Sequence, residues 1–137
     1  TAAQVDFAVR VDRALAEHDL AAWRELAGMS SAPLACVPAA MARRLLEEPD
    51  PRTGLGRLES LALGAIRAGN DTPARIFQAV SAADSVPQFW GDTTLWAVIN
   101  GLAERRPPLV RIAGPAPRLP QWESPHDLNQ FRIAMVA

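Results

Sequence analysis

A short proline-rich segment, residues 49–54 (PDPRTG), interrupts a chain whose apolar residues otherwise recur at helical spacing. A proline inside a helix removes one backbone hydrogen bond and clashes with the preceding turn, so no helix can run through two prolines and a glycine. The segment is therefore the best candidate boundary in the chain. We predict a helical appendage over residues 1–48, a linker over 49–54 and a second domain over 55–137.

The appendage has the apolar periodicity of amphipathic helices, which predicts three of them, over residues 4–17, 20–28 and 39–48. In the first helix, the apolar residues expected to lie mostly on one, inward face are Val5, Ala8, Val9, Val11 and Leu15. Asp19 is the expected cap of the second helix, because its carboxylate can accept hydrogen bonds from the free N–H groups of the first turn. Pro38 suits the start of the third helix, where its missing N–H costs nothing.

In the second domain, the stretch from residue 72 to 110 predicts a helix, a loop, a second helix and the start of a strand. That order of elements is typical of a winged helix-turn-helix. Thr72 should cap a helix that Pro73 opens, and Asp92 should cap the next helix, over residues 93–104. Another helix, over residues 57–68, precedes them. We therefore expect a mainly α fold in which a helical N-terminal appendage is followed by a winged helix-turn-helix with a short β wing.

The wing is expected to begin with a strand over residues 109–112 and to return along residues 118–124. The tail, residues 131–137, alternates like a strand, but Asn129 could equally cap a helix, and we lean slightly towards a helix. Phe89 and Trp90 should point towards the core. The other expected core residues are Leu58, Leu61, Ile66, Ile76, Phe77, Val80, Leu95, Trp96, Ile99, Leu102 and Val110.

Composition narrows the classes of function. The formal net charge is −1, so the chain has no overall basic field that would gather nucleic acid or anionic lipid. The single cysteine, Cys36, cannot form an internal disulfide, which makes a reducing cytoplasm the expected location. No apolar run approaches the roughly 20 residues that span a bilayer, so we expect no membrane contact. The sequence starts at Thr1 and stops in an apolar stretch, and we expect it to be a piece of a longer protein.

Five segments carry a resemblance to a known family: RRLLEE, GLGRLESLALGAI, TPARIFQA, FWGDTTLWAVINGLA and PPLV, in this order between residues 43 and 110. Together they cover about half of the chain. This stretch resembles the C-terminal half of functionally uncharacterised bacterial proteins that contain the domain of unknown function 1835. The resemblance implies a helical fold and supplies no catalytic residues. The family's N-terminal domain and its final Trp- and Gly-containing segment are not in this sequence, which agrees with a truncated chain.

DNA binding is one hypothesis for a winged helix, with the helix over residues 93–104 in the major groove. Base contacts favour Arg, Lys, Asn or Gln near the start of such a helix. Here the helix starts with Asp92, Thr93 and Thr94, and the only Asn in this helix is Asn100. A candidate set of phosphate contacts comprises Arg75, Arg105, Arg106, Arg111 and Arg118. Acidic residues in the same half of the chain balance their charge, which makes a mixed-charge surface the simpler interpretation.

A protein-interaction module is the competing hypothesis, because tryptophan is enriched among the residues that anchor interfaces. Of the four tryptophans, Trp122 lies beside Pro120 in the wing and is the one expected to be exposed. It would either contact a partner or pack against the body of the domain.

Enzyme chemistry has little support. His18 and His126 each precede an Asp, but neighbours in sequence usually point apart. Ser30, Ser31 and Cys36 share a loop that follows His18 in the sequence. No metal-ligand spacing and no glycine-rich phosphate loop occurs, so we expect neither metal nor cofactor. The sequence therefore leaves the function unknown. The preferred interpretation is a non-enzymatic binding module that contacts a protein partner or another domain of its parent chain. The alternative is a DNA-binding winged-helix domain.

Overall fold

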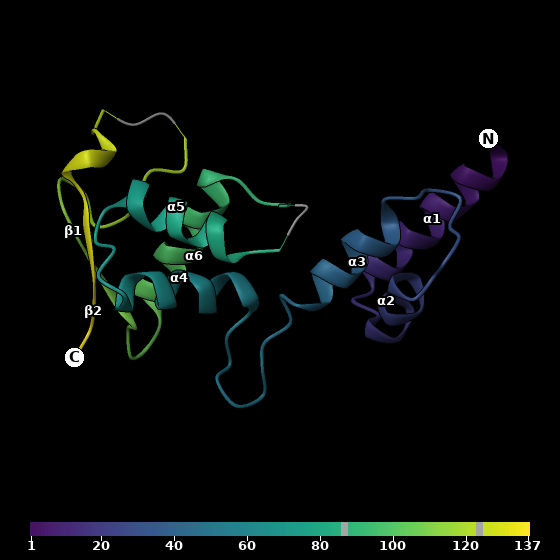
Figure 1. Cartoon of the computed structure of the whole chain (residues 1–137), viewed down its shortest axis with the longest axis horizontal. Helices are drawn as coiled ribbons and strands as arrows, with labels where there is room; N and C mark the ends of the chain where they lie inside the picture. Colours follow the sequence, from purple (N-terminus) through teal and green to yellow (C-terminus); the bar gives the residue numbers. More distant parts are fainter. Residues whose placement is uncertain (86–87, 123–124) are drawn as a thin grey trace. The chain divides into compact units, whose positions relative to one another are not determined.

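A computed structural model describes residues 1–85, 88–122 and 125–137 of the chain. It divides into two compact units, Thr1–Gly54 and Leu55–Ala137. The described part is mainly helical, with one small antiparallel sheet in the second unit (Figure 1). Each unit has its own hydrophobic core.

The first unit consists of three helices, α1 (Ala2–Ala16), α2 (Leu20–Ala27) and α3 (Val37–Leu45). The predicted cap of α2 is confirmed, since Asp19 Oδ1 accepts hydrogen bonds from the N–H groups of Ala21 and Ala22, both at 3.0 Å. Pro38 lies in the first turn of α3, as expected, although this helix begins and ends earlier than the sequence predicted.

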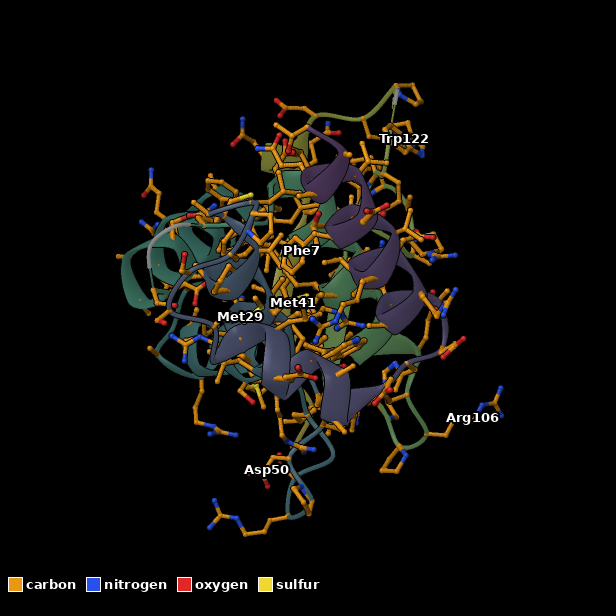
Figure 2. The ribbon with its side chains drawn as sticks, turned by 90° about the vertical axis from the view of Figure 1, so that its right-hand side faces the viewer. Phe7, Met29, Met41, Asp50, Arg106 and Trp122 are labelled. Atoms are coloured by element: carbon orange, nitrogen blue, oxygen red, sulfur yellow. The ribbon has the colours of Figure 1, made fainter. Side chains whose placement is uncertain are left out.

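Trp23 on α2 anchors the core of the first unit. Its ring is buried, and its Nε1–H donates to the carbonyl of Ala14 on α1 at 2.9 Å. Phe7 on α1 and Met41 on α3, both labelled in Figure 2, belong to the same core.

The predicted inward face of α1 was wrong except at Val11. Phe7, Val11 and Ala14 face inward, at the i, i+4, i+7 spacing of one helix face, whereas Val5, Val9 and Leu15 are exposed. The physical reason is that the aromatic ring of Phe7 buries more apolar surface than the valines do. It therefore decides which face of α1 packs.

The second unit contains α4 (Arg57–Arg67), α5 (Pro73–Ala83), α6 (Asp92–Glu104), β1 (Val110–Ala113), a 3₁₀ turn η1 (Leu128–Gln130) and β2 (Arg132–Met135). The Thr72 cap of α5 is confirmed, because its hydroxyl accepts from the Arg75 N–H. Asp92 is not the cap of α6 but its first residue, and Gly91 occupies the cap position.

The predicted core of the second unit is confirmed, with Leu61 and Phe77 only partly buried. Sequence analysis missed Leu119, Phe131 and Ile133.

The sheet pairs β1 with β2 in antiparallel register, with Val110 opposite Met135. The predicted returning strand over residues 118–124 was therefore wrong over residues 118–122, which are not the partner of β1. Residues 123–124 of that prediction lie outside the described part of the chain. The helix favoured for the tail was also wrong, because Phe131 and Ile133 are buried and Ile133 N–H donates to the Asp71 carbonyl at 2.8 Å. Gly114 makes the turn after β1 at φ +153°, and a Cβ there would come within 3.0 Å of Phe131 Cδ1.

A buried carboxylate fixes the connection between α5 and α6. The side chain of Asp84 is only 1% exposed and is held by Arg57 Nε and by Trp90 Nε1–H, each at 2.7 Å. Trp90 is therefore buried, as predicted. Phe89 was predicted to be buried but is 50% exposed, because its neighbour Trp90 takes the inward position.

We expect Trp96→Ala to lower the free energy of unfolding by about 3–5 kcal/mol, because the side chain is 4% exposed and packs against Phe77. Urea unfolding followed by circular dichroism measures the change. Trp122→Ala is the matched control, since this side chain is 86% exposed, and it should change stability by no more than about 0.5 kcal/mol. Equal effects of the two substitutions would contradict the packing described here.

Candidate interaction groove

The long connection from β1 to β2 is held on α6 by a buried amide. Asn100 Nδ2–H donates to the carbonyl of Leu119 at 2.9 Å, and Asn100 Oδ1 accepts from the N–H of Leu119 at 2.8 Å. Both residues are almost completely buried. Asn100, the one Asn that sequence analysis considered for base readout, is thus used inside the unit and does not reach its surface.

This anchored connection forms one wall of a groove at the N-terminal end of α6. The groove has two adjoining parts, of about 720 Å³ and about 580 Å³, which share Asp92, Trp96 and Leu128. Such volumes fall in the range of ligand-binding sites. The first part is lined further by Thr93, Pro120, Gln121 and Trp122. The second is lined further by Ala74, Phe77, Gln78, Gln88, Trp90 and Gly91.

Four of the described residues that line the groove are aromatic, although Trp90 and Trp96 are themselves largely buried. Phe77 contacts Trp90 edge-on at 5.5 Å between ring centroids and Trp96 at 6.3 Å, so these three rings form one cluster. Trp122 lines the first part of the groove together with Trp96 and is almost fully exposed. The sequence predicted this exposure. It did not predict the groove, whose walls come from segments far apart in the chain.

Asp92 is the only charged residue among the described residues that line the groove. Its Oδ1 accepts a hydrogen bond from the N–H of Thr93 at 2.7 Å. Within the described parts of the chain it makes no ion pair. The groove is thus apolar and aromatic with one exposed negative charge.

Carboxylates neutralise three of the five arginines that sequence analysis assigned to phosphate contacts. Arg75 pairs with Asp71 at 3.8 Å, Arg105 with Glu59 at 2.9 Å and Arg118 with Glu104 at 3.0 Å. Arg106 and Arg111 are exposed and form no ion pair with a described residue. Figure 2 shows Arg106 extending well away from Trp122.

The exposed face of α6 carries no basic side chain. Its exposed residues are Asp92, Thr94, Ala97, Gly101 and Glu104. Of these, only Thr94 has a side-chain group that can donate a hydrogen bond to a base.

The residues weighed for catalysis serve other contacts. His18 Nε2 lies 3.1 Å from Glu48 Oε2, a partner that sequence spacing did not suggest, and the His18 ring packs edge-on against Trp23. Asp19, its neighbour in sequence, caps α2. Cys36 is exposed. Among the described residues, no cluster of three or more His, Cys, Asp or Glu could hold a metal ion.

We expect Asn100→Ala to lower the free energy of unfolding by about 2–3 kcal/mol, because it leaves the N–H and the carbonyl of Leu119 buried without partners. The NMR resonance of the Trp122 indole N–H should also shift, since the anchored connection carries that residue. Asn129→Ala, at an exposed position of the same connection, is the control. A loss of less than about 0.5 kcal/mol in Asn100→Ala would show that the amide does not hold the connection.

In the described part of the chain, no helix is long and apolar enough to cross a membrane. Comparison of the chain with protein-family models, with curated proteins and with solved structures finds no match. The resemblance of residues 43–110 to proteins with the domain of unknown function 1835 therefore stays a prediction from short motifs. The groove and the charges around it are the features that bear on function.

Proposed function

We propose that this chain is a non-enzymatic protein-interaction module, and that the groove beside Trp122 is its binding site. The observation that carries the proposal is the 86% exposure of the Trp122 side chain next to an aromatic groove. Leaving so large an apolar ring in water is unfavourable, and tryptophan is the residue type most typical of interface anchors. The partner is a separate protein or another domain of the parent chain.

The anchoring of the chain at Leu119, close to Trp122, also favours binding. Leu119, three residues before it, is buried and clamped by Asn100. The connection is therefore already fixed at Leu119 before a partner arrives. A preformed site loses less conformational entropy on binding than a loop that must first become ordered.

We also propose that the second unit is a winged helix-turn-helix. The order α4, α5, α6, β1, β2 supports it, as does the hydrogen bond that ties β2 to Asp71 between α4 and α5. A winged helix serves equally as a DNA reader or as a scaffold for protein contacts, so the fold does not choose between them.

DNA binding is the second candidate, and the exposed Arg106 and Arg111 favour it. Three observations weigh against it. The exposed face of α6 offers hardly any donor for base edges, it carries Asp92 and Glu104 towards its two ends, and Asn100 is buried. Affinity for DNA also rises with the number of phosphates neutralised, and Arg105 and Arg118 already pair with carboxylates.

We expect a random heptapeptide library displayed on phage and selected on the whole chain to yield binders. In fluorescence anisotropy with the selected peptides, Trp122→Ala should weaken binding roughly tenfold or more, as the loss of a central anchor does. Val5→Ala, at another exposed apolar position outside the groove, should leave affinity unchanged. Failure to select any binder, or equal affinity of Trp122→Ala and the unaltered chain, would overturn the proposed site.

For a labelled random DNA duplex, we expect no micromolar binding even at low salt, because few unpaired arginines are available to displace counterions. Anisotropy at low salt and again at physiological salt measures this. Tight binding that falls steeply with salt, and that the double substitution Arg106→Ala/Arg111→Ala abolishes, would instead establish the DNA-binding alternative.

A further inference from the structure

The charge of the groove indicates what kind of partner segment it accepts, provided that the groove is the protein-binding site proposed above. Asp92 lines both parts of the groove and is the only charged side chain among the described lining residues. One of its oxygens accepts the N–H of Thr93. The other, Oδ2, makes no hydrogen bond with a described residue, so the carboxylate keeps most of its capacity to accept.

The surface around Asp92 suits the side chain of arginine better than that of lysine. Trp122 and Trp96 line the same part of the groove as Asp92, and Trp122 exposes most of its ring. A guanidinium group is planar, stacks on aromatic faces and donates two parallel hydrogen bonds to a carboxylate, whereas an ammonium group is a compact and strongly hydrated point charge. Arginine can therefore use the carboxylate and the ring together.

The remaining lining groups suit the peptide chain that would carry the arginine. Gln121, which also lines the groove, has a buried Nε2 without a hydrogen-bond partner among the described residues. Pro120, Leu128 and Phe77 supply apolar surface on either side of Asp92. Acidic segments and nucleic acid backbones are disfavoured by the same carboxylate.

We propose that the groove binds an extended protein segment in which an arginine, flanked by apolar residues, places its guanidinium against the Asp92 carboxylate and the Trp122 ring. The apolar neighbours of that arginine occupy the surfaces of Pro120, Leu128 and Phe77. Recognition thus combines burial of the aromatic rings with one charge-assisted pair. Apolar contact supplies affinity, and Asp92 supplies the preference for arginine.

The test uses the heptapeptides selected on the whole chain from the random library. We expect them to share an arginine next to apolar residues. In synthetic versions, replacing that arginine by citrulline, which keeps the shape and removes the charge, should weaken binding about tenfold. On the Asp92→Asn chain, the same replacement should have little effect, because the charge partner is already gone.

Glu104→Gln is the matched control, since it removes a carboxylate from the same helix about 18 Å away along α6, and it should preserve the tenfold effect of citrulline. The NMR resonance of the Trp122 indole N–H should shift with the arginine peptide, while that of Trp23 in the first unit stays in place.

The outcomes separate the two proposals. Selected peptides without a shared arginine, or an equal citrulline effect on the unaltered and Asp92→Asn chains, would overturn the arginine preference. If those peptides still required Trp122, the protein-interaction function would stand. If no peptide bound at Trp122, both proposals would fall together. The citrulline effect on the unaltered chain needs no variant, and the comparison on the Asp92→Asn chain is made with peptides that this chain still binds.

Discussion

The paired hydrogen bonds between the amide of Asn100 and the backbone of Leu119 are the interaction on which the surface of the second unit depends. The Asn100 amide satisfies both the backbone N–H and the backbone C=O of Leu119 in the interior, as the backbone of a neighbouring strand would in a sheet. Leu119 can therefore be buried although it belongs to no helix or strand. The path of the connection past α6 follows from this contact, and with it the wall of the groove.

A second buried polar group acts in the same way on the other side of the groove. The carboxylate of Asp84 joins Arg57 at the start of α4 to the indole of Trp90 before α6. Removing Arg57 would leave the buried carboxylate of Asp84 without its cationic partner, which is the costly case for a buried ion pair. Both walls of the groove are thus set by polar contacts with fixed geometry, whereas the helices beneath them pack through apolar contacts that tolerate adjustment.

Local signals in the sequence predicted most of the helices. Asp19 and Thr72 act within their own first turns, and the periodic apolar residues of α4, α5 and α6 are buried as expected. What the sequence did not predict depends on distant contacts. The partner of β1 lies about twenty residues further along the chain, and the face of α1 that packs is decided by Phe7. The groove is of this second kind: Trp122 could be expected to be exposed, but its relation to Asp92 and Trp96 arises only when residues 114–122 fold back on α6.

The position of β2 has a consequence for how the second unit folds. This strand pairs with β1 and also bonds to Asp71, and its residue Ile133 completes the core together with Phe131, which immediately precedes the strand. The helices can begin to form from contacts within themselves, but the core closes only when residues near the end of the unit reach residues near its beginning. Contacts so distant in sequence are slow to form, because a long loop must first be closed. During synthesis on the ribosome, the unit would therefore remain open, with its apolar face uncovered, until residues 131–135 have emerged.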